Sequence, residues 1–328
     1  MRAVQILKDN AGQRAELTEI PDDEIGEGDV TIEVDYSAVN FKDGLGVTGA
    51  VPVVERFPIV AGIDLAGTVV EATVESGFTP GDSVAVNGWG LAVSHNGGFA
   101  TRARVPAAWI TRIPPRFTTW QAMAIGTAGY TAALSVKALQ RHGLTPDAGP
   151  VVVTGAAGGV GSVAIALLAG IGFEVHASTG RLGEKDYLQN LGALEIIPRE
   201  DLAEPVQAAL GSERWAGGVD VVGSHTLVNV LSQIRYGGVV ANCGLAQGLE
   251  LPGSVAPFIL RGVTLAGIDS VNAPANSRND AWQLLDEHLD ERLLDEMTTT
   301  VPLHQAATVA QQVLTGAVRG RTVVDVNA

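Results

Sequence analysis

A glycine-rich segment in the middle of the chain follows a run of β-branched residues and precedes an apolar stretch. The run Val151–Thr154 leads into Ala156-x-Gly158-x-x-Gly161, and the apolar stretch continues to Gly170. Glycines at a strand-to-helix turn let the backbone approach a pyrophosphate closely, while free N–H groups and the helix dipole attract its charge. The setting predicts a dinucleotide-binding site, and an ordinary tight strand–helix connection is the alternative.

The residues after the next expected strand bear on the choice between NAD and NADP. Proteins that prefer NAD usually place an acid about twenty residues further on, where it binds the adenosine ribose 2′-hydroxyl. Here Thr179-Gly180-Arg181 follows, and the next acid is Glu184. A hydroxyl and a guanidinium suit a 2′-phosphate, which a carboxylate would repel. Arg199, after the third strand, could add a second charge, so NADPH is predicted; solvated surface is the alternative for both arginines.

Candidates for catalysis lie where an early strand is expected to meet a helix, at Asn40, Lys42 and Asp43. If the dinucleotide is a nicotinamide that supplies hydride and no metal takes part, hydrogen-bond donors are needed to polarise a substrate carbonyl. Asn40 and Lys42 are the leading donors, and Asp43 could orient Lys42 or hold the turn. The structural alternative makes Asn40 an N-cap and Asp43 a complement to the helix start. Trp89, between two glycines, could line the nicotinamide or substrate, or belong to the core.

The elements that carry these residues fall into two regions. Residues 1–110 are predicted to be β-rich, and Thr118 and Gln121 have capping-box spacing ahead of a helical stripe over Trp120–Leu139. From Val151 strand and helix patterns alternate, which predicts a parallel, doubly wound α/β sheet. The expected strands are Thr31–Val39, Gly67–Ala72, Ser83–Val86, Val151–Thr154, Glu174–Ser178, Ile196–Ile197, Val219–Val222, Val239–Cys243, Val263–Gly267 and Thr322–Val326, with a further helix over Asn276–Glu291.

Composition limits the class of protein. A chain of 328 residues with 46% hydrophobic and 17% charged residues predicts two well-packed domains. The net charge of −15 argues against general binding of nucleic acid or anionic membranes. Cys243 is the only cysteine, so neither an intrachain disulfide nor a Cys-rich zinc site is expected. Met1–Asn10 shows no signal pattern and Val160–Ile171 is too short to span a bilayer, which predicts a soluble cytoplasmic protein.

Several segments together resemble the medium-chain dehydrogenase/reductase superfamily along essentially the whole chain. The resemblance is greatest to a zinc-free branch that contains acryloyl-CoA reductases and quinone-oxidoreductase-like proteins, for which Asn-Phe-Lys-Asp, Gly-Trp-Gly and Thr-Gly-Arg are the most specific segments. The segments that carry it, besides the glycine loop and Thr179–Arg181, are Asn40–Asp43, Pro58–Gly67, Gly88–Gly90, Gly126–Ala132, Pro257–Arg261 and Gly320–Val324.

This resemblance implies a GroES-like catalytic domain formed by residues 1–122, with residues 298–328 returning to it. A Rossmann NADPH-binding domain over residues 123–297 and a cleft at the junction are also implied, and related proteins are usually homodimers. By position, the residues implied to line the cofactor are Phe41, Thr127, Ala157, Gly158, Gly159, Val160, Thr179, Gly180, Arg181, Arg199, Leu245, Ile259 and Ser270.

The resemblance also implies metal-free chemistry. Alcohol dehydrogenases of the superfamily hold zinc partly through Cys, whereas this strand ends in Ala38-Val39-Asn40 without a following Gly-His-Glu. His95 alone would make a poor zinc site. Some enoyl reductases use a Tyr proton donor after this motif, but Gly46–Gly49 contains none, so water or a ribose hydroxyl remains open as the proton source.

The expected function is NADPH-dependent reduction of the carbon–carbon double bond of a short enoyl-CoA, with acryloyl-CoA to propanoyl-CoA as the specific hypothesis. One alternative is reduction of quinones or free enones with the same hydride donor. The other is an NADPH-binding protein with little turnover. The three differ in whether NADPH is consumed, and with which acceptor.

Overall fold

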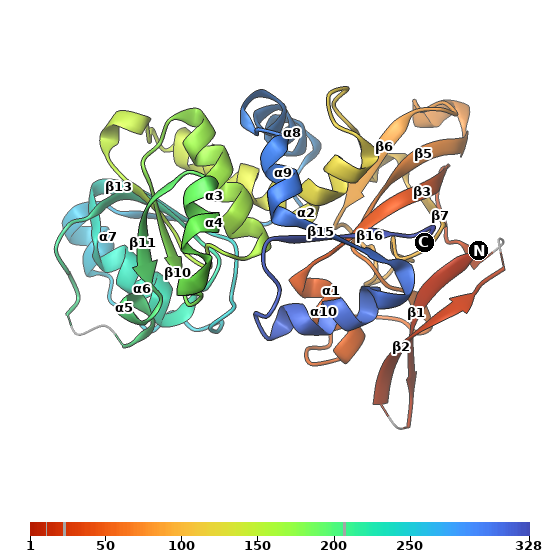
Figure 1. Ribbon diagram of the computed structural model, residues 1–328, viewed down its shortest axis with the longest axis horizontal. Coiled ribbons are helices and arrows are strands. Elements are labelled where there is room, and N and C mark those ends of the chain that lie inside the picture. Colours follow the sequence, from red (N-terminus) through yellow and green to blue (C-terminus); the bar gives the residue numbers. More distant parts are fainter. Residues whose placement is uncertain (11, 22–23, 206–207) are drawn as a thin grey trace. The chain divides into compact units, whose positions relative to one another are not determined.

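The computed structural model of the protein describes residues 1–10, 12–21, 24–205 and 208–328. The chain divides into two compact units (Figure 1). The first unit is Met1–Thr127 together with Leu294–Ala328, and the second unit is Ala128–Leu293. The domain boundaries expected from the sequence, after residues 122 and 297, stay a prediction.

The first unit is built on a seven-stranded sheet of order β15-β16-β3-β5-β6-β8, with β7 pairing to β3. The C-terminal strand β16 pairs antiparallel with β3, where Thr322 faces Val39. A smaller sheet of order β2-β1-β4 includes a hairpin that the sequence did not indicate. The elements are β1 (Arg2–Asp9), β2 (Gly12–Glu19), β3 (Val30–Val39), α1 (Phe41–Thr48), β4 (Ile59–Val60), β5 (Asp64–Ala72), η2 (Val74–Ser76), β6 (Ser83–Asn87), β7 (Arg102–Val105), η3 (Ala107–Trp109), β8 (Ile110–Arg112), β15 (Thr298–Pro302), η6 (Leu303–Gln305), α10 (Ala306–Leu314) and β16 (Arg321–Asp325).

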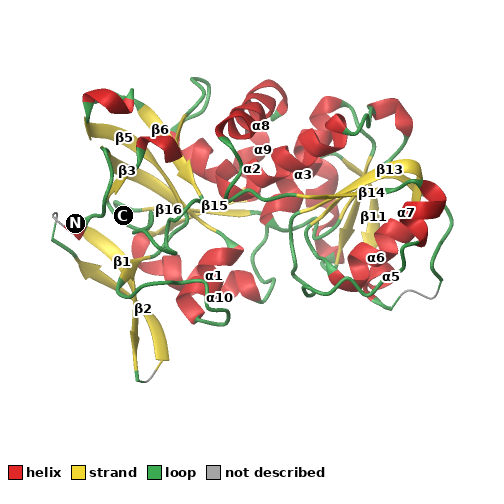
Figure 2. Ribbon diagram, turned by 180° about the vertical axis from the view of Figure 1, so that it is seen from behind, coloured by secondary structure: helices red, strands yellow, loops and turns green. Residues whose placement is uncertain are grey.

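The second unit contains a six-stranded parallel sheet of order β11-β10-β9-β12-β13-β14, with helices packed against it (Figure 2). The strand order reverses between β9 and β12, as in a doubly wound sheet, so the predicted fold class is confirmed. Its elements are η4 (Pro146–Ala148), β9 (Val151–Val153), α3 (Gly159–Ile171), β10 (Val175–Thr179), η5 (Leu182–Glu184), α4 (Lys185–Asn190), β11 (Ala193–Pro198), α5 (Glu200–Ala203), β12 (Trp215–Asp220), α6 (Ser224–Ser232), β13 (Ile234–Asn242), α7 (Ala256–Arg261), β14 (Thr264–Gly267) and α8 (Ala275–His288); α2 (Thr119–Arg141) and α9 (Arg292–Met297) span the divisions between the units.

Helix α2 departs from the single continuous helix expected over Trp120–Leu139. Gly126 has φ 50° and ψ −164°, a conformation that interrupts the helix and that side chains other than glycine rarely adopt. A Cβ at this position would also collide with the Arg321 guanidinium. The capping box is confirmed, because the Thr118 N–H donates to Gln121 Oε1 at 2.9 Å and the Gln121 N–H donates to Thr118 Oγ1 at 3.1 Å.

Helices α1 and α10 of the first unit lie side by side (Figure 1). Gly44 on α1 permits this approach, because a Cβ there would overlap the Ala310 carbonyl and the Leu314 side chain. The position of α1 matters for function because it carries Lys42 and Asp43.

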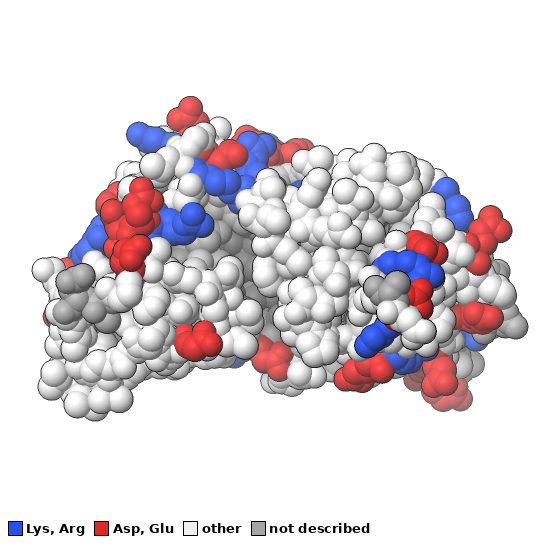
Figure 3. All heavy atoms as spheres, turned by 90° about the horizontal axis from the view of Figure 1, so that it is seen from below, with Lys and Arg blue, Asp and Glu red and all other residues white. Residues whose placement is uncertain are grey.

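The surface carries both signs of charge. On the face shown in Figure 3, Lys and Arg side chains lie beside Asp and Glu side chains rather than in a field of one sign. Within the described part of the chain, none of the helices combines the length and the apolar character needed to cross a lipid bilayer.

Candidate active site and cofactor site

The start of α1 is tied to the loop before β5 by one buried carboxyl group. Asp43 Oδ2 accepts the Asn40 N–H at 2.8 Å, and Asp43 Oδ1 accepts the Ile63 N–H at 2.9 Å. The first bond is half of a capping box, so Asp43 does complement the helix start as the structural alternative stated. The second bond fixes the helix against the strand that carries Asp64.

Asp64 is the centre of a buried polar cluster that sequence reasoning missed. It is fully buried, yet its carboxylate accepts four hydrogen bonds from residues far apart in the chain. Asn87 Nδ2 and Thr127 Oγ1 donate to Oδ1 at 2.7 and 2.5 Å. Asn40 Nδ2 and the Thr127 N–H donate to Oδ2, both at 2.8 Å. The sequence did contain one signal of this cluster, which is an acid inside the otherwise apolar stretch 59–66. A buried acid is tolerated only when it is hydrogen-bonded or paired with a charge.

Arg321 is the cation of the same cluster. Its side chain is buried, and its guanidinium donates to Asn40 Oδ1 at 3.3 Å and to the Ala124 and Val39 carbonyls at 2.9 and 3.3 Å. Burial lowers the pKa of Arg321, while the charges of Asp64 and Asp43 raise it. The guanidinium therefore compensates the buried carboxylates.

Burial raises the pKa of Asp43 from its ordinary 3.8 to about 7, and the neighbouring charge of Asp64 acts in the same direction. The N–H groups of Asn40 and Ile63 oppose this rise because they favour the carboxylate. Asp43 therefore holds a proton over part of the neutral range in the folded protein but not in the unfolded chain.

We expect Asp43 to make the folded state less stable as pH rises from about 4 to about 7. Over that window the folded state binds more protons than the unfolded state, so the free energy of unfolding falls with pH, by about 4 kcal/mol in the limit. Asp43→Asn removes this titration, and urea unfolding at a series of pH values measures it. A variant whose stability has the same pH slope as the wild type over that window would contradict the assignment.

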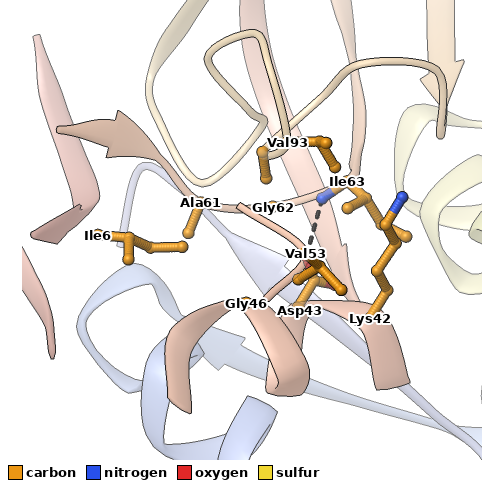
Figure 4. Close-up of a pocket in the computed structure, with 10 residues that line it drawn as sticks. Ile6, Lys42, Asp43, Gly46, Val53, Ala61, Gly62, Ile63 and Val93 are labelled. Carbon is orange, nitrogen blue, oxygen red and sulfur yellow. Dashed lines mark hydrogen bonds between the residues drawn. The ribbon is translucent and has the colours of Figure 1, made fainter. Parts of the chain in front are cut away.

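Lys42 and Asp43 line a small pocket of the first unit, with room for about one water molecule (Figure 4). Lys42 extends from the start of α1, and its side chain lines the pocket together with Ile63 (Figure 4). Both hydrogens of the Asn40 amide are directed to internal acceptors, namely Asp64 and the Ala38 carbonyl at 3.3 Å. Because its donors already satisfy buried acceptors, the structure favours a structural role for Asn40, and donation by Asn40 to a substrate carbonyl stays a prediction. Lys42 stays the leading donor.

Trp89 is half-buried and packs against the hydrophobic core of the first unit. Its ring stacks on that of Trp109, with centroids 6.2 Å apart and planes 6° from parallel. His95 contacts the edge of the same Trp109 ring, and its Nε2 lies 2.7 Å from the Glu27 carbonyl oxygen. Both observations favour the structural interpretations. Among the described residues, no three His, Cys, Asp or Glu side chains group as metal ligands would, and metal-free chemistry stays a prediction.

The glycine-rich turn of the second unit joins β9 to the N-terminus of α3, as predicted. Gly155 has φ 58°, which favours glycine. A Cβ at Gly161 would overlap the backbone of Ala156, so this glycine permits close packing of helix and turn. A Cβ at Gly158 would approach only the Gly155 carbonyl oxygen, at 3.2 Å, which leaves the helix N-terminus accessible to a ligand. The turn fits a pyrophosphate.

One guanidinium group contacts this turn, and a second lies beside Gly180, after the neighbouring strand. Arg181 Nη2 donates to the Ala157 carbonyl at 3.1 Å, and the Arg181 N–H donates to Thr179 Oγ1 at 3.0 Å. Strand β11 lies beside β10 and parallel to it, so Arg199, which follows β11, lies at the same edge of the sheet as the residues that follow β10. The Arg199 N–H donates to the Thr179 carbonyl at 2.9 Å. A Cβ built on Gly180 would lie 2.7 Å from the Arg199 guanidinium carbon. The neighbouring strands thus bring the two predicted cations to one place.

The other predicted cofactor residues are distributed over both units. Gly159 and Val160 open α3, while Leu245 and Ile259 are exposed after β13 and on α7. Ser270 follows β14. Phe41 and Thr127 belong to the first unit, where Phe41 is exposed and Thr127 is bound to Asp64. Their contacts with a cofactor stay predictions.

A second buried carboxylate lies where the strand order reverses. Asp220, at the end of β12, accepts hydrogen bonds from Thr154 Oγ1 at 2.6 Å, the Gly223 N–H at 2.8 Å and Asn242 Nδ2 at 2.7 Å. Burial raises its pKa, and these bonds oppose the rise. The Asp220 carboxylate thus links the carboxyl ends of β9, β12 and β13.

Cys243 follows β13 directly. Burial raises the pKa of its thiol to about 12, which supports a structural role for the residue.

Comparisons with known proteins match this architecture. The alcohol dehydrogenase GroES-like domain matches residues 26–115, and the zinc-binding dehydrogenase model matches residues 159–287. The acrylyl-CoA reductase AcuI of Ruegeria pomeroyi is 48% identical over 97% of this chain and 94% of its own. The yhdH oxidoreductase of Salmonella enterica, crystallised with NADP, is 42% identical with a TM-score of 0.96 over 99% of each chain. The Bacillus subtilis protein yhfP, with NAD bound, is 40% identical with a TM-score of 0.95 over 99% of this chain and 98% of its own.

The chain therefore belongs to the medium-chain dehydrogenase/reductase superfamily, built from a GroES-like unit and a Rossmann unit. Within that superfamily it lies in the branch of the acrylyl-CoA reductases and the quinone-oxidoreductase-like proteins. The resemblance seen in the sequence is confirmed.

Proposed function

We propose that this protein is an NADPH-dependent reductase that converts acrylyl-CoA, or another short α,β-unsaturated acyl-CoA, to the saturated thioester. The observation that carries the proposal is the 48% identity with an acrylyl-CoA reductase over 97% of the chain. The paired arginines at the glycine turn support NADPH as the cofactor, as does the NADP found with the Salmonella relative.

Residues of the second unit fit the cofactor at three points. The N–H groups at the start of α3 would bind the pyrophosphate, and Arg181 and Arg199 would bind the 2′-phosphate. When bound, NADPH supplies the hydride that reduces the β-carbon of the substrate. The remaining chemistry, polarisation of the thioester carbonyl and protonation of the α-carbon, belongs to groups of the protein or solvent.

Lys42 is the proposed donor to the thioester carbonyl oxygen, where negative charge develops as the double bond is reduced. Four other residues have a positioning role, because together they fix the start of the helix that carries Lys42. They are Asn40, Asp43, Asp64 and Arg321. The proton for the α-carbon comes from water or a ribose hydroxyl, the two sources that the sequence left open.

The proposal predicts rapid oxidation of NADPH when acrylyl-CoA is added, followed at the nicotinamide absorbance. Lys42→Met should lower kcat about 10²-fold or more, because one donor to the developing oxyanion is lost, while NADPH still binds. Lys8→Met is the control, since Lys8 lies over the Phe57 ring and has no proposed role in the reaction. Cofactor binding without turnover of any acceptor would instead favour the third function named above.

Quinone or enone reduction is the second candidate function. It is favoured by the 40% identity, over 98% of each chain, with the putative quinone oxidoreductase YhfP of Bacillus subtilis. A quinone offered in place of the thioester distinguishes the two. Oxidation of NADPH with the quinone alone would select this candidate and reject the first.

We also propose that the protein is a homodimer, with a cytoplasmic location. Strand β14 is the last strand of its sheet, and large apolar side chains are exposed on β13, on α7 and on the segment between them, which precede β14 in the chain. An open sheet edge beside exposed apolar residues is typical of an interface between subunits. A mass in solution equal to that of one chain would refute the dimer. The exposed residues are Tyr236, Leu249, Leu251, Val255, Ile259 and Leu260.

A further inference from the structure

We propose that Arg278 is a positioning residue for the cofactor, which holds the β14–α8 loop, residues 268–274, in the conformation that receives the nicotinamide half of NADPH. The inference rests on the proposed function, because it requires that NADPH binds the second unit. It concerns a residue that the sequence alone assigned only to a helix.

Arg278 clamps the loop through its carbonyl groups. The residue lies in the first turns of α8, and its side chain is buried. Nη2 donates to the Ser270 and Val271 carbonyls at 3.1 and 2.7 Å, and Nε donates to the Ala273 carbonyl at 3.1 Å. Three carbonyls of one short loop are therefore directed to a single planar cation, whose fork geometry suits several acceptors at once.

Two neighbours hold the clamp and the loop in place. The Arg278 guanidinium lies 5.1 Å from the centre of the buried Tyr130 ring, so an aromatic face supports it from α2. At the other end of the loop, Asp269 Oδ1 accepts the Val271 and Asn272 N–H groups at 2.8 and 3.1 Å. N–H groups of the loop are thus bonded to Asp269, and its carbonyls are bonded to Arg278. These bonds restrict the conformations that the loop can adopt.

The order of the strands indicates what this loop faces. A dinucleotide on a doubly wound sheet lies across the carboxyl ends of the strands, with its pyrophosphate where the order reverses. Arg181 and Arg199 follow β10 and β11, so the adenosine half lies over that side of β9. The nicotinamide half must then extend over the ends of β12, β13 and β14, and residues 268–274 follow β14 directly.

Release of the clamp should weaken NADPH binding without changing the adenosine subsite. A loop that occupies its binding conformation for only a tenth of the time raises the apparent Kd about tenfold. Arg278→Met leaves the three carbonyls without their donor, and we expect an increase of about that size. Arg278→Lys keeps the charge but not the fork, so a smaller increase, about threefold, is expected.

The chain provides a matched control in Arg261. Its guanidinium also donates to three backbone carbonyls, those of Gly211, Ser232 and Ile234, at 2.6, 2.9 and 3.3 Å. These carbonyls precede β12 and begin β13, which places this second clamp at the amino ends of the strands. Arg261→Met should therefore lower thermal stability, as Arg278→Met does, but leave the Kd for NADPH unchanged.

Calorimetric titration with NADPH and with 2′,5′-ADP, which carries only the adenosine half, tests the assignment. We expect Arg278→Met and Arg278→Lys to weaken NADPH and to leave 2′,5′-ADP unchanged. An unchanged Kd for NADPH in both variants would refute the positioning role, as would equal weakening of both ligands. Failure of the wild-type protein to bind NADPH would refute the proposed function itself, which keeps the two conclusions separate. If Arg278→Met does not fold, the Arg278→Lys protein alone decides.

Discussion

Asp64→Ala is expected to lower the free energy of unfolding of the protein by about 3–5 kcal/mol. The change removes the acceptor for four hydrogen bonds from Asn40, Asn87 and Thr127. It also deprives the buried Arg321 of a nearby compensating charge. Breaking a buried ionic network by removing one partner leaves the others desolvated and unpaired, which is among the costliest single changes in a protein. Urea unfolding followed by circular dichroism measures the loss.

Asp9→Ala provides the comparison for this variant. Asp9 also pairs with an arginine, Arg14, but about half of each side chain is exposed. An exposed pair contributes about 0–1 kcal/mol, so the two variants should differ by several kcal/mol. Asp64→Asn should fall between them, because it retains one acceptor oxygen and places an NH₂ group against donors. A loss below 1 kcal/mol in Asp64→Ala would show that the cluster is not needed for the stability of the fold.

Arg181→Ala is expected to weaken NADPH binding by about 1.5–3 kcal/mol, which corresponds to a Kd about 10- to 150-fold higher. The Arg181 guanidinium already contacts the glycine turn through the Ala157 carbonyl, and the Arg199 guanidinium lies beside Gly180, the preceding residue. A 2′-phosphate bound there would receive charge-assisted hydrogen bonds that a 2′-hydroxyl does not. The Kd for NADH should therefore change little, so the variant loses its preference for the phosphorylated cofactor.

Titration of the wild-type protein and the variant with both cofactors measures that preference. Arg141→Ala serves as the control, because Arg141 forms an exposed pair with Asp280 in the same unit. Equal losses for NADPH and NADH would refute the 2′-phosphate assignment. The test has added weight because the related yhfP structure contains NAD, so members of this branch differ in the cofactor found with them.

The sequence predicted the second unit well because its signals are local. The glycine turn, the β-branched strands and the two arginines each lie within a few residues of the feature they identify. Parallel strands place their carboxyl ends at one edge, so Arg181 and Arg199 come together once the strand order is known. The predicted strands here correspond to β9–β14, with differences at their ends.

The polar cluster of the first unit could not be predicted in the same way. Asp64 obtains its partners from positions 40, 87 and 127, and Arg321 approaches Asn40 only after the last strand has joined the sheet. No local pattern links those positions, so a single sequence showed only an acid and an arginine in apolar surroundings. Arg278 was hidden for another reason, since an arginine early in an amphipathic helix is usually solvated.

Pairing of β16 with β3 has a consequence for biosynthesis. Residues 30–39 are synthesised before the second unit, but residues 321–325, which cover one edge of β3 and supply Arg321, are synthesised after it. The Rossmann unit is one continuous segment and can fold while translation proceeds, whereas the GroES-like unit keeps an open strand edge until residues 321–325 have been synthesised. We therefore expect the nascent first unit to expose an unpaired strand edge for longer than the second unit does, and so to be the more prone to aggregation during synthesis.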